Sequence, residues 1–273
     1  MTVTPENAAW FAGTFGKLVD NVGLALLGKG PVIRLALTCM LSEGHLLLED
    51  APGTGKTALA RALAATVQGT HNRIQFTPDL LPSDITGVTM YDQNRGTWEF
   101  HRGPIFASIV LADEINRASP KTQSALLEVM EESHVTVDGT RYDTGRPFMV
   151  VATQNPIEQA GTYPERSAMI QILAGASHPD RTKTLRPIIA TSAVADMADM
   201  IAENSVAESV LDYVHRLAEH TRDNDDTILG VSTRGAIGMV RAAKVWAGAH
   251  GRNYVIPDDV KELASTVWTH RMV

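Results

Sequence analysis

Two short segments of the chain each combine an apolar run with a polar end. In the first, the run at 46–48 leads into a glycine-rich turn that ends in Gly55-Lys56-Thr57. In the second, the run at 109–112 ends in Asp113-Glu114. A strand feeding a glycine-rich turn, with a second strand ending in an acidic pair, is what a nucleoside triphosphatase with a phosphate-binding loop requires.

The glycine-rich turn has the chemistry of a triphosphate site. Glycine allows backbone N–H groups to approach phosphate closely, and the following helix N-terminus adds a favourable dipole. Lys56 would reach the β- and γ-phosphates, and the Thr57 hydroxyl would bind Mg²⁺. The predicted nucleotide contacts are Asp50, Ala51, Pro52, Gly53, Thr54, Gly55, Lys56, Thr57 and Ala58. The pattern G-x-x-x-x-G-K-[ST] has Asp50 in place of its first glycine, and a chance turn before a surface helix is the alternative.

The acidic pair follows a fully apolar run, as expected at the end of a buried parallel strand. Ligands of open α/β sheets bind at the carboxyl ends of the strands. Asp113 is therefore placed to hold Mg²⁺ through water, together with Thr57, and also to line the nucleotide site. Glu114 can polarise the attacking water and, with Lys56, is predicted to be catalytic. A solvated strand end is the alternative interpretation.

Composition limits the function classes. The 273 residues are 44% hydrophobic, which is enough for a large core and two domains. The formal net charge of −7 argues against a protein whose main task is to wrap nucleic acid. Cys39 is the single cysteine and is predicted to be a packed thiol. There is neither a membrane-spanning apolar run nor a secretory leader pattern, so we expect a cytoplasmic protein.

The order of predicted elements gives an α/β class with a helical second part. We expect helices in 1–44, strands at 45–49, 73–76, 105–112 and 148–153, hairpins at 87–100 and 135–142, and a helix at 120–132 capped by Ser119. From Arg166 the chain becomes alanine-rich and lacks strand patterns. The predicted domains are an α/β nucleotide-binding core at 1–164 and an all-α lid at 165–273.

Several longer segments resemble the MoxR family of AAA+ ATPases, over nearly the whole chain. They lie at 76–87, 103–106, 112–118, 121–128 and 152–159. The resemblance implies an AAA+ core with a parallel sheet in the order 5-1-4-3-2 and a small helical lid. It also implies ATP and Mg²⁺ as ligands and ring assembly, with a hexamer expected. The hairpin at 87–100 would line the ring pore, and the hairpin at 135–142 would precede the strand that carries the first sensor.

Three further roles follow from the same resemblance. Asn155 would be the first sensor, whose amide can contact the γ-phosphate and the attacking water. Arg234 would be the second sensor, reaching the γ-phosphate from the start of a lid helix. Gly28 would lie in the adenine-side loop, next to a variant residue where the family commonly has Gln. The alternative for Asn155 is a helix or turn cap before Pro156, and the alternative for Arg234 is a solvated side chain.

One expected stretch has no counterpart. After Gly-Thr-Tyr-Pro the family continues into a segment with a fifth strand and an arginine offered to the neighbouring subunit, whereas here 161–164 leads directly into a helical pattern. Either the chain lacks both features, or residues are missing between about 161 and 166; the second is our prediction. The trans-acting arginine is unassigned, with Arg117 a distant candidate.

The sequence therefore predicts an ATP-hydrolysing, ring-forming chaperone or remodeller. By resemblance it would work with a von Willebrand A domain protein and a client, in maturation, complex assembly or metal-cofactor insertion. A nucleic-acid motor or loader is the alternative from another class, and the acidic balance disfavours it. A nucleotide-gated scaffold with little hydrolysis is a third possibility.

Overall fold

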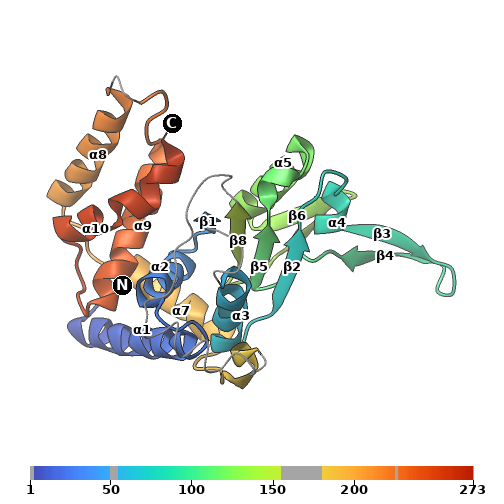
Figure 1. Cartoon of the computed structure of the whole chain (residues 1–273), viewed down its shortest axis with the longest axis horizontal. Helices are drawn as coiled ribbons and strands as arrows, with labels where there is room; N and C mark the ends of the chain where they lie inside the picture. Colours follow the sequence, from blue (N-terminus) through green and yellow to red (C-terminus); the bar gives the residue numbers. More distant parts are fainter. Residues whose placement is uncertain (1–2, 50–54, 155–179, 225–226, 273) are drawn as a thin grey trace. The chain divides into compact units, whose positions relative to one another are not determined.

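The computed structural model describes residues 3–49, 55–154, 180–224 and 227–272 (Figure 1). The chain folds into two compact units. The sheet unit comprises 19–36 and 45–192, and the helical unit comprises 1–18, 37–44 and 193–273. The α-helices are α1 Pro5–Ala25, α2 Gly30–Leu41, α3 Lys56–Thr66, α4 Pro82–Thr86, α5 Pro120–Glu132, α7 Thr191–Ala202, α8 Glu208–Arg222, α9 Thr233–Ala249 and α10 Pro257–Trp268. The short 3-10 helices are η1 Ile115–Arg117, η2 Arg181–Thr184 and η3 Thr269–Arg271.

The sheet unit is built on four parallel strands, seen at the centre of Figure 1. They are β1 Leu46–Glu49, β2 His71–Gln75, β5 Ile109–Asp113 and β8 Met149–Gln154. Their spatial order is β1-β8-β5-β2, which confirms the 1-4-3-2 part of the AAA+ order. The predicted fifth strand and the proposed missing stretch fall in 155–179, outside the described residues.

The two central strands consist of continuous apolar runs because both of their faces are covered. Val110 and Leu111 in β5, and Val150 and Val151 in β8, have no exposed surface. The register pairs Leu111 with Val151, so these runs lie side by side. Helix α3 contacts β5 and β2 through its buried residues. The last residues of β5 and β8 consequently reach the same edge of the sheet.

Both predicted hairpins are confirmed. The first pairs β3 Gly87–Asp92 with β4 Thr97–Arg102 and projects from the sheet (Figure 1). The second pairs β6 His134–Val137 with β7 Thr140–Asp143. Its two turn residues, Asp138 and Gly139, have φ of 50° and 76°, as expected for a tight Asp-Gly hairpin turn.

The boundaries of two other elements are informative. The prediction that a strand begins at residue 105 is wrong, because β5 begins at Ile109. The Ile105 N–H instead donates to the carbonyl of Ile85, outside the sheet. The predicted cap of α5 is confirmed, since the Ser119 side chain accepts from the backbone N–H of Thr122.

The helical unit joins the C-terminal helices to α1 as far as Leu18 and to the end of α2 from Leu37. A Cβ on Gly248 in α9 would lie 2.3 Å from the Ile201 side chain and 3.1 Å from that of Phe11, so glycine permits this packing. The N-terminal helices are therefore shared between the two units, whereas the sequence placed them wholly with the sheet. The predicted boundary at 164/165 falls outside the described residues, and residues 180–192, which the prediction assigned to the lid, lie in the sheet unit. Within the described ranges, no helix has the length and apolar character needed to cross a membrane.

Candidate nucleotide-binding site

The loop that leads into α3 is described from Gly55 onward; Asp50, Ala51, Pro52, Gly53 and Thr54 lie outside the described residues. Gly55 is the N-cap of α3 and has a left-handed φ of 98°. A Cβ there would meet no atom within 4 Å, so the glycine is required by the backbone angle and not by space. The helix begins at Lys56, which places Lys56, Thr57 and Ala58 in its first turn as predicted.

Lys56 lies next to the end of β8. Its Nζ donates to the backbone carbonyl of Gln154 at 3.4 Å. This contact follows from the strand order, because β1 and β8 are neighbours with Glu49 opposite Gln154. The lysine of the glycine-rich turn is thus brought to the sheet edge where β5 also ends.

Asp113 is held by side chains from two neighbouring strands. Its Oδ2 accepts from the Arg73 guanidinium of β2 at 2.6 Å, and its Oδ1 accepts from the Thr153 hydroxyl of β8 at 2.5 Å. Arg73 also donates to Gln75 Oε1 at 2.8 Å. The carboxylate is therefore fixed in one orientation at the carboxyl end of β5.

Glu114 has an unusual backbone conformation. Its φ of 59° is left-handed, a region that residues with a side chain rarely adopt. Its backbone N–H donates to Thr153 Oγ1 at 3.0 Å. Its Oε2 accepts from Gln75 Nε2 at 3.1 Å and from the Arg117 guanidinium at 2.9 Å. Glu114 is thus held at its amide by β8 and at its carboxylate by β2 and η1.

The oxygen atoms at this edge fit a magnesium nucleotide. Carboxylate and hydroxyl oxygens are the ligands that Mg²⁺ uses, and it commonly keeps several of its waters. Both oxygens of Asp113 already accept hydrogen bonds, from Arg73 and Thr153. A contact to the metal through water leaves both bonds in place, which agrees with the role predicted for Asp113.

The remaining predicted residues are placed as follows. Gly28 follows α1 and has a left-handed φ of 71°. Arg234 is the second residue of α9, whose N-cap Ser232 accepts from the Gly235 N–H at 3.2 Å. Arg234 belongs to the helical unit, and Asn155 lies outside the described residues. The structure therefore brings together Lys56, Asp113 and Glu114, and it leaves the two sensor roles as predictions.

Three polar side chains at this edge were missed by sequence reasoning: Arg73, Gln75 and Thr153. Arg73 and Gln75 lie in β2, which pairs with β5 so that Gln75 is opposite Asp113. Thr153 lies in β8, on the other side of β5. The available signal was the strand order, because a polar residue at the end of a strand next to β5 must lie near the acidic pair.

His45 has a structural role at the opposite end of β1. Its Nδ1 accepts from the Val150 N–H at 3.0 Å, and its Nε2 lies 2.9 Å from the Met130 carbonyl. The ring is therefore neutral with its proton on Nε2. Burial lowers the pKa of His45, because the charged form would lose hydration.

The described ranges hold no cluster of His, Cys, Asp or Glu suited to a metal ion. Burial also raises the pKa of the Cys39 thiol to about 12.

Comparison with known proteins gives matches over both units. The model of the ATPase family associated with various cellular activities (AAA) matches residues 45–172, and the AAA lid domain matches residues 219–273. The uncharacterized protein YeaC of Bacillus subtilis is 43% identical, over 94% of this chain and 86% of that protein. Chaperone MoxR1 of Mycobacterium tuberculosis is 37% identical, over 98% of this chain and 78% of that protein.

A solved structure gives the same result for the fold. A crystal structure of a Cytophaga hutchinsonii protein assigned as an ATPase superposes with a TM-score of 0.89 and 34% identity. It covers 98% of this chain and 89% of that chain. The alignment with MoxR1 extends over 293 residues, more than the 273 of this chain, so MoxR1 carries residues that have no counterpart here.

Proposed function

The chain belongs to the MoxR family of AAA+ ATPases, and on this premise we propose that it hydrolyses ATP with Mg²⁺ to remodel or mature client proteins. The observation that carries the catalytic part is the convergence of Lys56, Asp113 and Glu114 at one edge of the sheet. A cation for the phosphates, a carboxylate for the metal and a carboxylate for the water are the parts that this hydrolysis needs.

Each residue has a distinct task in the proposed reaction. Lys56 would bind the β- and γ-phosphates, while Thr57 and Asp113 would hold the Mg²⁺, which would supply charge neutralisation at the phosphate oxygens. Glu114 accepts a proton from water as its oxygen bonds to the γ-phosphorus. The bond from that phosphorus to the β–γ bridging oxygen breaks, and ADP leaves with its electron pair. Asn155 and Arg234 are proposed to contact the γ-phosphate, and Gly28 to lie beside the adenine.

Phosphate release with Mg²⁺ and with a chelator tests this proposal. We expect turnover with Mg²⁺ and its loss when the metal is removed. A protein that binds ATP but releases no phosphate with Mg²⁺ would instead support the nucleotide-gated scaffold.

We further propose assembly into a nucleotide-linked ring, expected to be a hexamer. ATP bound between subunits would couple binding to assembly by mass action. Arg117 is a poor candidate for the trans-acting arginine, since its guanidinium is 2.9 Å from Glu114 of its own chain. Sedimentation with a non-hydrolysable ATP analogue should show a larger species, and a monomer at saturating nucleotide would refute the ring.

Client binding is supported by the β3–β4 hairpin. Four of its large apolar side chains are exposed: Val88 40%, Met90 53%, Tyr91 50% and Trp98 71%. Exposed apolar groups of this kind suit nonpolar segments of another protein.

Arg95 is paired with Asp92 and Glu99, so the basic group near the turn is neutralised, which disfavours the nucleic-acid motor. A von Willebrand A domain partner and metal-cofactor insertion are proposed from family resemblance, and a cytoplasmic location stays a prediction. Co-purification of native partners with the wild type and with Trp98→Ala tests the client proposal.

A further inference from the structure

We propose that Thr153 is a positioning residue whose single hydroxyl sets both carboxylates of the site; the inference rests on the proposed Mg²⁺-dependent hydrolysis. Thr153 Oγ1 donates to Asp113 Oδ1 at 2.5 Å and accepts from the Glu114 N–H at 3.0 Å. It thereby connects the proposed metal-binding residue to the backbone of the proposed general base. Thr153 contacts neither metal nor substrate in this role and acts through Asp113 and Glu114.

The location of Thr153 makes these two bonds specific. It lies one residue from the end of β8, next to β5, and is only 1% exposed. A hydroxyl carries one proton and two acceptor sites, so it can give one bond and take another at the same time. Water has little access to this oxygen, and the protein must satisfy it internally.

The bond to Glu114 fixes a backbone that would otherwise relax. A left-handed φ at a residue with a side chain persists where surrounding contacts determine it. The Thr153 oxygen holds the Glu114 N–H in this conformation. Without that acceptor, Glu114 could turn to an ordinary φ, and its carboxylate would point elsewhere. Asp113 would lose the fixed direction of Oδ1 and keep its ion pair with Arg73, whose side chain is half exposed.

Packing alone does not explain a threonine here. The four residues that precede it in β8, Met149, Val150, Val151 and Ala152, are all buried and apolar. Valine has the same branched shape as threonine and equal suitability for a strand, without a polar atom to satisfy. The hydroxyl is therefore the feature that needs a reason, and its two partners supply one.

The test compares Thr153→Val with Thr153→Ser in the full chain. Valine keeps the shape and removes the hydroxyl, whereas serine keeps the hydroxyl. We expect Thr153→Val to lower the Mg²⁺-dependent gain in affinity for a fluorescent ADP about tenfold, with metal-free affinity unchanged. The kcat for ATP should fall about thirtyfold or more, with KM changed little. Thr153→Ser should stay within about threefold of wild type on each measure.

Several outcomes would overturn the proposal. One is a Thr153→Val protein with wild-type magnesium dependence and kcat, and another is a Thr153→Ser protein as impaired as Thr153→Val. If Thr153→Val does not melt cooperatively, Thr153→Ala against Thr153→Ser isolates the hydroxyl. In the wild type, hydrogen exchange at the Glu114 amide should be slow, and fast exchange refutes the bond without any variant. A wild type with no magnesium effect refutes the proposed function itself, a separate result.

Discussion

The edge of the four-stranded sheet and the β3–β4 hairpin differ in which side chains they bury. At the sheet edge, the side chains of Asp113 and Glu114 are only 19% and 24% exposed, and their carboxylates are engaged by groups from neighbouring strands and η1. On the hairpin, large apolar side chains such as Trp98 are exposed. Each region departs from the rule that apolar groups lie inside and charges outside.

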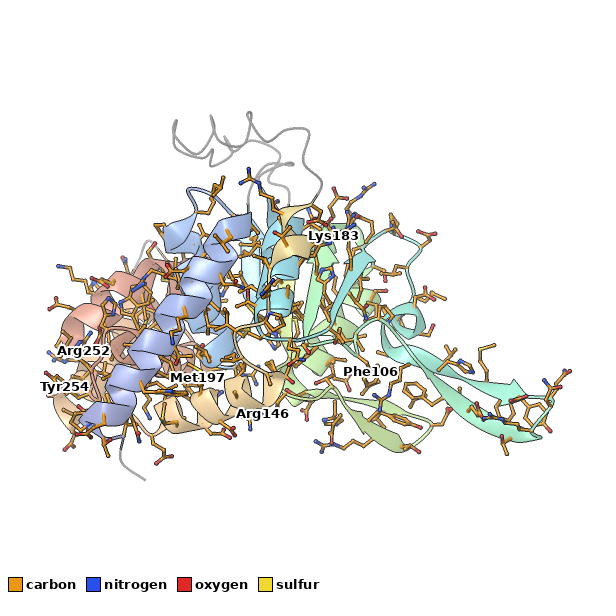
Figure 2. The ribbon with its side chains drawn as sticks, turned by 90° about the horizontal axis from the view of Figure 1, so that it is seen from below. Phe106, Arg146, Lys183, Met197, Arg252 and Tyr254 are labelled. Atoms are coloured by element: carbon orange, nitrogen blue, oxygen red, sulfur yellow. The ribbon has the colours of Figure 1, made fainter. Side chains whose placement is uncertain are left out.

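The base of the hairpin is packed, whereas its tip is exposed. Phe100 stacks on Tyr142 of the second hairpin with ring centroids 4.1 Å apart, and it meets Phe106 edge-on at 5.8 Å. Figure 2 shows Phe106 near this base. Toward the turn, the ring centroids of Tyr91 and Trp98 lie 5.3 Å apart. A packed base that supports an exposed apolar tip suits contact with a partner, whereas a fixed polar network suits chemistry.

The largest expected effect is at Glu114. Glu114→Gln should lower kcat by about 10²–10⁴-fold, because an amide cannot accept the proton from water. ATP affinity should change little, since Asp113, the carboxylate proposed to bind the metal, remains. Phosphate release and a fluorescent nucleotide titration measure the two effects. The matched control is Glu99→Gln on the hairpin, which should leave turnover unchanged; wild-type turnover in Glu114→Gln would show that the base is misassigned.

Lys56→Ala should come next, with nucleotide affinity lowered about 10–100-fold through loss of charge-assisted hydrogen bonds to phosphate. Isothermal titration with ADP and with a non-hydrolysable ATP analogue measures it. Lys121→Ala removes a lysine from the exposed start of α5 and serves as the control. Equal affinities for the two variants would show that Lys56 does not bind the nucleotide.

On the hairpin, Trp98→Ala should affect partner binding and Phe100→Ala should affect stability, although both residues lie on one face of β4. Trp98→Ala should weaken capture of an unfolded model protein several-fold and change stability by no more than about 0.5 kcal/mol. Phe100→Ala should destabilise by about 1–3 kcal/mol, because it removes the stack on Tyr142. Urea unfolding and a binding assay separate these effects. If Trp98→Ala lost stability as Phe100→Ala does, the tip would be part of the core.

The smallest expected effect is the pH dependence of stability that comes from His45, at the amino end of the sheet. Because the folded pKa of His45 is lowered, the unfolded chain binds the proton more readily. Stability should be full above the ordinary histidine value of about 6.5 and should fall as pH decreases toward the lowered folded pKa. The slope from this group is at most about 1.4 kcal/mol per pH unit. Urea unfolding at several pH values should show a shallower dependence in His45→Asn; equal slopes would contradict the neutral, buried assignment.

Local signals in the sequence predicted local structure well. Ser119 before Pro120 marked the start of α5, and Asp138-Gly139 marked the second hairpin turn. These succeed because a cap or a tight turn is decided by residues within a few positions. The strand at 105 failed because the Ile105 N–H is taken by Ile85, twenty positions away, which no local pattern encodes. The strand order itself came from family resemblance and not from the strands' own patterns.

The sequence by itself determined the chemistry of the site: a lysine and a threonine at a helix start, and two carboxylates after a buried strand. Parallel strands bring their carboxyl ends to one edge, so these groups had to converge. The tertiary structure decided what holds them. Thr153 and Arg73 act on Asp113 from about 40 residues away in sequence, and His45 joins Met130 to Val150. A hydrogen bond requires groups within about 3 Å of each other, and that distance is set only when the strands have packed in register.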